Sequence, residues 1–219
     1  LGPQSDCALD TFKIGIYRAR SGRKEKALLE LGKSVVRAAM ELSSIKPKVI
    51  AFCCTSGSFI KGENYNNEII KKIEEKVNIT TITTTSAVIK AFKALNLKKI
   101  SMVTPYNVEI AEKEAFFFEK AIKNFKVLRM KNLGIIEALP KGNLSPYMAY
   151  NCAKEVDLPK AEAIFISCTN FRTKEIIDLL EEDLSKPVIT SNQATIWAAL
   201  KEIGVGRMYN FGKLFKEFL

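Results

Sequence analysis

The sequence predicts an α/β protein built from two pseudo-symmetric halves. Each half should hold a parallel sheet covered by helices, with a site in the cleft between them. Three observations support this prediction. Short apolar runs alternate with amphipathic segments along the whole chain, a weak internal repeat relates two parts of it, and polar residues follow the repeated runs. Such alternation is typical of βαβ units and parallel sheets.

Seven segments are predicted as strands because they are rich in apolar and β-branched residues and too short for independent helices. They cover residues 12–19, 48–53, 79–83, 99–104, 125–130, 163–167 and 187–190. Seven amphipathic segments alternate with them and are predicted as helices. They cover residues 24–42, 64–77, 86–95, 108–122, 146–156, 174–184 and 193–203. Helical crossovers connect parallel strands, so we expect both faces of each sheet to be covered.

The charge of the chain is strongly positive, with 34 Lys and Arg residues against 24 Asp and Glu residues, a formal net charge of +10. Most lysines lie on predicted helix faces among glutamates, which is typical of solvated surfaces. Nucleic-acid binding is therefore a distant alternative, whereas a diffuse positive field would attract small anions. No apolar run reaches the roughly 20 residues that span a bilayer, and no signal peptide opens the sequence. We predict a cytoplasmic protein with no nucleic-acid or membrane partner.

The chain has five cysteines and no histidine. An odd number of irregularly spaced cysteines argues against a disulfide framework. The lack of both a CxxC pair and histidine argues against a zinc site, so we expect no metal. Free thiols in a reducing compartment are the remaining interpretation.

A weak internal repeat relates the two Cys-Thr dipeptides. VIAFCCTS aligns with AIFISCTN so that Cys54 meets Cys168, and TITTTSAVIKAF aligns with VITSNQATIWAA so that Thr83 meets Thr190. A third match, of TPYN with the opening GPQSD, keeps a consistent cyclic order. Three ordered matches indicate two pseudo-symmetric halves. The predicted boundaries are residues 1–103 plus 190–219 for the first half and residues 104–189 for the second.

Each Cys-Thr dipeptide is predicted where a strand ends and a helix begins, at the edge of a parallel sheet where ligands bind. Thr55 and Ser56 supply hydroxyl donors at the first site, and Thr169 and Asn170 supply donors at the second. Exposed N–H groups at a helix start favour an anion such as a carboxylate. The same amides can lower the pKa of a thiol and so supply thiolate without histidine.

The cysteines are not equivalent. A thiol at the end of an apolar strand is usually inert packing, but two such thiols related by a repeat favour a functional pair. Neighbouring strand residues face opposite sides of a sheet. The repeat selects Cys54, which leaves Cys53 in the core. Cys7 and Cys152 have no comparable setting and are interpreted as structural.

The motifs CTSGSF, SCTNFRT, TPY and GPQSD, in order over nearly the whole chain, resemble the maleate isomerase and arylmalonate decarboxylase branch of the aspartate/glutamate racemase superfamily. This resemblance implies a cofactor-independent enzyme with two α/β halves. It also implies that Cys54 and Cys168 are catalytic and lie on opposite sides of a small carboxylate substrate.

The resemblance assigns further residues to the substrate. Thr55 and Ser56 match donors to a substrate carboxylate, Tyr106 of TPY matches a tyrosine that binds the same group, and Thr169 contributes a backbone amide. Asp6 falls where the isomerases carry an asparagine that contacts substrate. A second isomerase asparagine falls at Ala138, which has no side-chain donor.

Because both cysteines are present, the chain resembles the isomerases and racemases more than the decarboxylases, which typically keep only the second cysteine. The expected function is isomerisation or racemisation of a small mono- or dicarboxylate, and we expect a homo-oligomer. Two alternatives stay open. One is an arylmalonate-type decarboxylase that uses Cys168 as proton donor, and the other is a protein that binds small carboxylates without catalysis.

Overall fold

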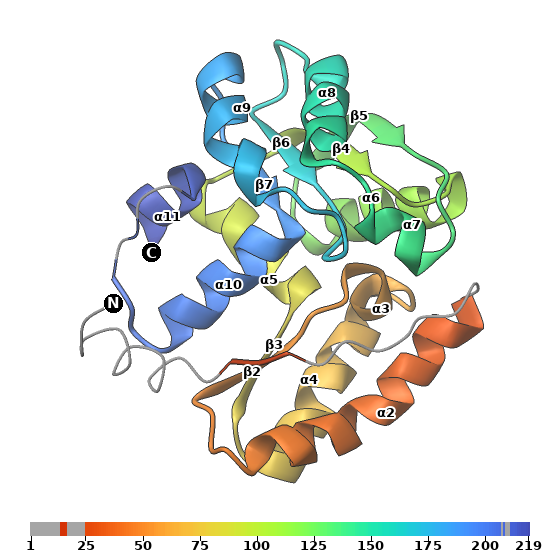
Figure 1. The fold of residues 1–219 in the computed structure, drawn as a ribbon, viewed down its shortest axis with the longest axis vertical. Helices are drawn as coiled ribbons and strands as arrows, with labels where there is room; N and C mark the ends of the chain where they lie inside the picture. The colour runs from red at the N-terminus through yellow and green to blue at the C-terminus, as the bar shows by residue number, and fades with distance from the viewer. Residues whose placement is uncertain (1–13, 17–24, 207, 209–210) are drawn as a thin grey trace.

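The computed structural model describes residues 14–16, 25–206, 208 and 211–219. The strands in this part of the chain form two separate, wholly parallel sheets (Figure 1). The first has the order β1-β2-β3 and the second the order β5-β4-β6-β7. The strands are β1 (Ile14–Ile16), β2 (Val49–Phe52), β3 (Thr80–Thr83), β4 (Lys99–Thr104), β5 (Lys126–Asn132), β6 (Ala163–Ile166) and β7 (Val188–Thr190).

Helices connect the strands and cover the sheets. They are α2 (Glu25–Ser43), α3 (Thr55–Phe59), α4 (Glu63–Val77), α5 (Thr84–Ala94), α6 (Val108–Ala121), α7 (Ala138–Gly142), α8 (Pro146–Val156), α9 (Ile177–Leu184), α10 (Ser191–Glu202) and α11 (Gly212–Phe218), with a 3₁₀ turn η1 (Lys174–Ile176) before α9. None of the helices in the described ranges is both long and apolar enough to cross a membrane.

The two faces of the small sheet have different neighbours, as strand alternation requires. Ile50 and Phe52 of β2 pack in a cluster with residues of α2 and α4. Val49 and Ala51 belong instead to the main core, which also contains residues of α5, α10 and the second sheet. Figure 1 shows α5 and α10 between the two sheets. The predicted α/β class with two parallel-sheet halves is therefore confirmed.

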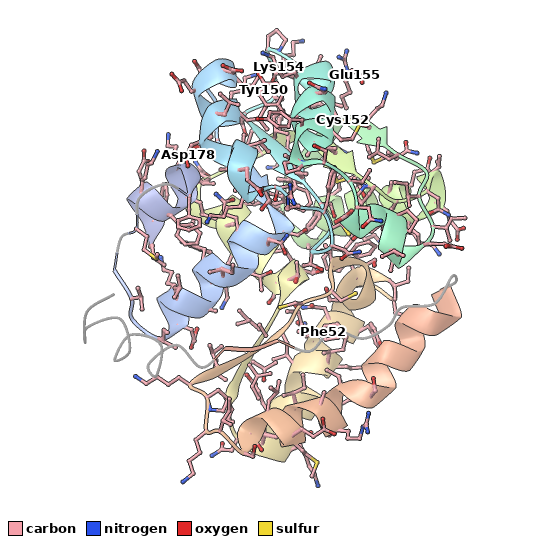
Figure 2. The ribbon with its side chains drawn as sticks, in the orientation of Figure 1. Phe52, Tyr150, Cys152, Lys154, Glu155 and Asp178 are labelled. Atoms are coloured by element: carbon pink, nitrogen blue, oxygen red, sulfur yellow. The ribbon has the colours of Figure 1, made fainter. Side chains whose placement is uncertain are left out.

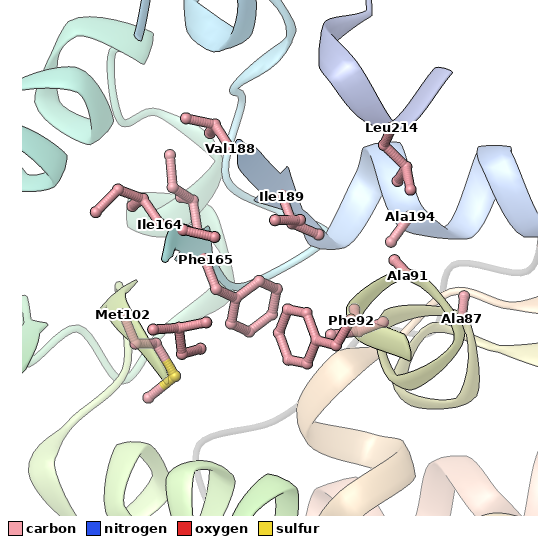
Figure 3. Packing of buried hydrophobic residues seen from close by; sticks show 14 of the residues in the cluster. Ala87, Ala91, Phe92, Met102, Ile164, Phe165, Val188, Ile189, Ala194 and Leu214 are labelled. Carbon is pink, nitrogen blue, oxygen red and sulfur yellow. The ribbon is translucent and has the colours of Figure 1, made fainter. Parts of the chain in front are cut away.

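An aromatic cluster joins α5 to the second sheet. Phe92 of α5 packs edge-on against Phe118 of α6 and Phe165 of β6, with ring centroids 5.3 Å apart in both pairs, and stacks on Phe125 at 5.1 Å. Figure 3 shows Phe92 facing Phe165, while Ala91 of α5 lies against α10. Burying one such ring contributes about 1.5–3 kcal/mol, so this cluster stabilises the contact between the halves.

The repeat found in the sequence corresponds to equivalent structure. Phe52 pairs with Thr83 at the end of β2, and Ile166 pairs with Thr190 at the end of β6. Each threonine then caps the helix that follows, in a capping box with Ser86 of α5 or Gln193 of α10. Since each catalytic candidate follows its strand by two residues, Cys54 and Cys168 occupy equivalent places in the two halves.

The predicted boundary after residue 103 does not separate the sheets. β4, assigned by sequence to the first half, pairs with β5 and β6 of the second sheet. The physical reason is that β4 sits at the centre of that sheet and belongs to the core shared by both halves. The helix start expected after Cys54 is present as α3, although its bounds were not predicted, and the short helices α7 and α11 were not predicted at all. Five to seven residues are too few for a clear amphipathic pattern.

Candidate active site

Cys54 lies at the start of α3, directly after β2. It is the N-cap residue of this short helix, and its thiol interacts with the backbone N–H of Gly57 and the hydroxyl of Ser56. A Cβ atom at position 57 would lie only 2.8 Å from Cys54 Sγ. Glycine at this position therefore lets the helix backbone approach the sulfur closely, as the small residues of the motif predicted.

Cys168 follows β6 in an unusual backbone conformation. Its φ of 90° lies in the left-handed region, which is costly for a residue with a side chain. The backbone N–H of Cys168 donates to Ser191 Oγ at 3.0 Å, and the thiol interacts with the backbone N–H of Asn170 and the hydroxyl of Tyr106. These contacts on both sides fix a strained residue, which is common at functional sites.

The two thiols belong to one electrostatic cluster. A negative charge on Cys54 raises the pKa of the Cys168 thiol, and a charge on either cysteine raises the pKa of Tyr106. The positive charge of Lys141 lowers the pKa of both thiols. Groups that influence one another in this way lie near one another, so the structure brings Cys54, Cys168 and Tyr106 together.

Burial dominates the ionisation of these thiols. It raises the pKa of Cys54 and of Cys168 above the ordinary value of 9.0, although the amide, hydroxyl and lysine neighbours oppose the shift. The neighbouring amides lower the pKa of each thiol as expected, but desolvation of the charged form outweighs these hydrogen bonds, so the amides alone do not supply thiolate. Burial likewise raises the pKa of Cys53 to about 11.

The threonines that follow the cysteines connect the halves. Thr55, fully buried, donates from Oγ1 to Ser191 Oγ at 3.0 Å. Thr169 donates from Oγ1 to the carbonyl oxygen of Cys53 at 3.1 Å. Both hydroxyl protons are therefore engaged within the protein. The Ser56 hydroxyl lies beside the Cys54 thiol, and its hydrogen bond lowers the pKa of that thiol against the effect of burial.

Ser191 was not identified from the sequence. Its hydroxyl accepts hydrogen bonds from Thr55 Oγ1 and from the backbone N–H of Cys168, both at 3.0 Å. It therefore links the first Cys-Thr dipeptide to the second. The repeat could have indicated it, because alignment of Thr83 with Thr190 also places Ser191 opposite Thr84, directly after a capping residue.

Lys141 was also missed. It lies on α7, in a segment that the sequence analysis treated as a connection. Its Nζ lies 5.0 Å from the centroid of the Tyr106 ring and donates to the carbonyl oxygen of Ile136 at 3.1 Å. Burial lowers the pKa of Lys141, against the attraction of the two cysteines. A lysine in a short segment with no periodic pattern carries no sequence signal of this position.

Of the other cysteines and candidate substrate-binding residues named from the sequence, some lie within the residues that the structure describes and some lie outside them. Asp6 and Cys7 lie outside the described residues. Cys152 is buried on α8, and Figure 2 shows it well separated from Phe52, the last residue of β2. Cys53 is only half-buried and packs at the edge of the main core. Ala138 begins α7, and its carbonyl oxygen accepts from Asn170 Nδ2 at 2.5 Å.

A cavity of about 360 Å³ is lined by residues that follow Cys168 in the chain, although Cys168 itself is not part of the lining. Thr169 and Asn170, the two residues after Cys168, line it together with Gly142, the residue after Lys141. The other lining residues are Leu139, Asn143, Phe171, Arg172 and Asn192. Side-chain amides and one guanidinium group dominate this lining, so the cavity is suited to polar or anionic small molecules.

Known proteins share both the sequence pattern and the fold. A family model described as arylmalonate decarboxylase matches residues 23–215. The arylmalonate decarboxylase of Bordetella bronchiseptica is 26% identical over 189 residues, covering 84% of this chain and 78% of that protein. The maleate isomerase of Alcaligenes faecalis is 23% identical over 175 residues, covering 77% and 68%.

A solved structure with the same fold carries a trapped intermediate. It is a maleate cis-trans isomerase mutant from Nocardia farcinica with a covalently bound succinylcysteine intermediate. Its TM-score is 0.85 at 17% identity, with 90% of this chain and 82% of that chain covered. At this identity the likeness establishes the fold of the two halves.

Proposed function

Because the chain belongs to the arylmalonate decarboxylase family, an enzyme family in the branch that also holds maleate isomerases, we propose that it is a cofactor-independent isomerase of small carboxylates that uses Cys54 and Cys168. The observation that carries this proposal is the position of two thiols at equivalent strand ends, near enough that a charge on Cys54 raises the pKa of Cys168 and that Lys141 acts on both. A cysteine that only packs in the core requires no second cysteine at the equivalent strand end and no hydrogen-bond donors around its thiol.

In the isomerase version, the Cys54 thiolate adds to one alkene carbon of a cis-enedioate. The π electron pair moves to the neighbouring carbon and its carboxylate, and Cys168 gives that carbon its proton. The former double bond is now single and rotates. The Cys168 thiolate then removes the proton that it gave to this carbon, and the carbon–sulfur bond breaks. The trans product is released, and Cys54 is again a thiolate. The succinylcysteine bound to the Nocardia farcinica enzyme supports this addition step.

In the racemase version, one thiolate removes the α-proton of the substrate and the other thiol delivers a proton to the opposite face. Both versions pass through an enolate-like species that fixed donors must stabilise. The hydroxyls of Ser56 and Tyr106 and the backbone N–H groups of Gly57 and Asn170 are such donors, because each lies at one of the two sulfurs.

The test replaces each thiol separately and screens maleate, aspartate, glutamate and substituted malonates for product. We expect Cys54→Ser and Cys168→Ser each to lower turnover by at least about a thousandfold, with the melting temperature almost unchanged. Cys53→Ser is the matched control, since it removes a neighbouring thiol outside the pair. Activity that survives in Cys54→Ser would contradict the two-thiol proposal.

The second candidate function is decarboxylation with Cys168 alone as proton donor, which the match to arylmalonate decarboxylase favours. It predicts CO₂ release from substituted malonates, loss of that activity in Cys168→Ser, and retention in Cys54→Ser. A protein that only binds carboxylates would release no product from any of these acids, while its thiols would still be protected by them from alkylation.

A further inference from the structure

Ser167 anchors the end of β6, directly before the second cysteine. Its backbone N–H donates to the carbonyl oxygen of Val103 on β4 at 2.8 Å. Its hydroxyl donates to Glu114 Oε1 on α6 at 2.5 Å. Neither Ser167 nor Glu114 has accessible surface. The residue before Cys168 is therefore held on one side by the neighbouring strand and on another by a helix.

The equivalent residue in the first half is held differently. The repeat aligns Ser167 with Cys53, whose thiol is half-buried and contacts the carbonyl oxygen of Ala51 in its own strand, at 3.7 Å. The residues that follow also differ. Cys54 has an ordinary extended backbone with a φ of −147°, whereas Cys168 has a φ of 90°. Of these two equivalent cysteines, the one that follows the anchored serine takes the left-handed conformation.

This conformation places the second thiol beside its hydrogen-bond donors. A left-handed backbone is costly for a residue with a side chain and persists where the surroundings impose it. In this conformation the Cys168 thiol meets the hydroxyl of Tyr106 and the backbone N–H of Asn170. A charge on Glu114 also raises the pKa of Tyr106, so the carboxyl group lies near this hydroxyl. Glu114 therefore reaches the second thiol by two routes, through Ser167 and through Tyr106.

A carboxyl group is a poor choice for packing alone at this depth. Oε2 of Glu114 is buried and has no hydrogen-bond partner among the described residues. Burying an unpaired polar atom is costly, and an apolar side chain of similar length would avoid that cost. The carboxyl group provides an acceptor for the Ser167 hydroxyl, which an apolar side chain cannot.

We propose that Glu114 is a positioning residue for the second thiol, because its carboxyl group accepts the Ser167 hydroxyl and so holds Cys168 in the left-handed conformation beside Tyr106. This inference rests on the proposed function, in which Cys168 transfers the substrate proton. Glu114 is sealed from solvent and acts only through its neighbours. The first thiol, whose strand end is held differently, does not depend on it.

The test compares the alkylation of the two cysteines by mass spectrometry after brief treatment with iodoacetamide at neutral pH. Glu114→Met removes the acceptor, and we expect Cys168 to react about tenfold more slowly relative to Cys54, because the displaced thiol loses its donors and with them thiolate. Ser167→Ala removes the hydroxyl and should give the same change, and the double variant should add nothing further. Glu114→Gln keeps the acceptor and should retain the ratio of the unsubstituted protein.

Two controls on the same helix separate positioning from general damage. Glu112 is exposed, and Glu112→Met removes the same charge without touching Ser167. Ala111 is buried one turn before Glu114, and Ala111→Gly weakens α6 while keeping the hydrogen bond. We expect both controls to leave the alkylation ratio unchanged. An unchanged ratio in both Glu114→Met and Ser167→Ala, an equal change in Ala111→Gly, or a changed ratio in Glu114→Gln would each overturn the proposal.

Turnover distinguishes this proposal from the proposed function. With an acid that the unsubstituted protein converts, Glu114→Met should lower kcat about tenfold and leave KM within about threefold, because it displaces the proton-transferring thiol. A raised KM at unchanged kcat would contradict the positioning role. If none of the tested acids is converted, the two-thiol function fails, whereas the alkylation ratio still decides whether Glu114 positions Cys168.

Discussion

Glu114 is a carboxyl group in the core of the second half, with no accessible surface. Ser167, the residue before Cys168, donates from Oγ to Glu114 Oε1 at 2.5 Å, whereas Oε2 has no partner among the described residues. Burial raises the pKa of Glu114 from 4.5 to about 8, against the hydrogen bond from Ser167. The folded protein therefore holds a proton that the unfolded chain releases.

This shift makes stability depend on pH. Between pH 4.5 and about 8 the folded state binds more protons, so the contribution of Glu114 is complete below pH 4.5 and is lost as the pH rises. We expect Glu114→Gln to remove a slope of up to about 1.4 kcal/mol per pH unit. Compared with the unsubstituted protein, the Glu114→Gln variant should therefore gain most in free energy of unfolding near pH 8. Urea unfolding at several pH values measures this.

The control for this prediction lies on the same helix. Glu112 is exposed on α6, and Glu112→Gln should leave the slope of stability against pH unchanged. Identical slopes for Glu114→Gln and the unsubstituted protein would show that Glu114 ionises in the core without penalty.

At the scale of elements, α5 and α10 start with the same capping box in different surroundings. Thr83 Oγ1 accepts from the N–H of Ser86 and also donates to Asn66 Oδ1 at 2.5 Å. Thr190 Oγ1 accepts from the N–H of Gln193 at 3.1 Å. We expect Thr190→Ala to lower the free energy of unfolding by about 1 kcal/mol. Thr83→Ala should cost more, because buried Asn66 loses its donor.

Denaturant unfolding of both alanine variants checks this order, with the serine variants as controls that keep the caps. Equal costs at the two positions would mean that the Asn66 contact contributes little. Such a comparison is direct because the internal repeat supplies the same motif twice.

Most elements could be predicted from their sequence patterns. The segments 99–104 and 146–156 match β4 and α8 in full, because a short run rich in apolar and β-branched residues and an N-terminal Ser-Pro are local signals. The position of α7 could not be predicted, since a segment with Pro140 and Gly142 has no helical periodicity. It is fixed by Asn170, which is close only in the folded chain.

At the scale of the whole molecule, the sequence could indicate residues that share a repeated motif but not those that meet through folding. Cys54 and Cys168 follow from the repeat. Lys141 reaches the site through contacts between elements far apart in the chain, and no spacing marks it. Ser191 is marked only by its alignment with Thr84 in the repeat, and its contacts with Thr55 and Cys168 arise through folding. The assignment of β4 to the first half was wrong for the same reason. Which strands β4 pairs with depends on the folded core and not on its own residues.

Ser191 tests whether the two halves are coupled at the site. Its hydroxyl accepts from Thr55 of one half and from the N–H of Cys168 in the other. Ser191→Ala leaves both donors buried without an acceptor, and we expect about 1–3 kcal/mol lower stability. Cys168, whose φ of 90° depends on such contacts, should then change its alkylation rate more than Cys54.

Ser191→Thr is the appropriate rescue, because the repeat places a threonine, Thr84, at the equivalent position of the first half. It keeps the hydroxyl and should restore both the stability and the alkylation rate of Cys168. Mass spectrometry after brief treatment with iodoacetamide reports each cysteine separately. If Ser191→Ala loses stability but leaves the relative alkylation of Cys168 and Cys54 unchanged, Ser191 only fills the interface. A selective change at Cys168 would instead mean that the first half positions the thiol of the second.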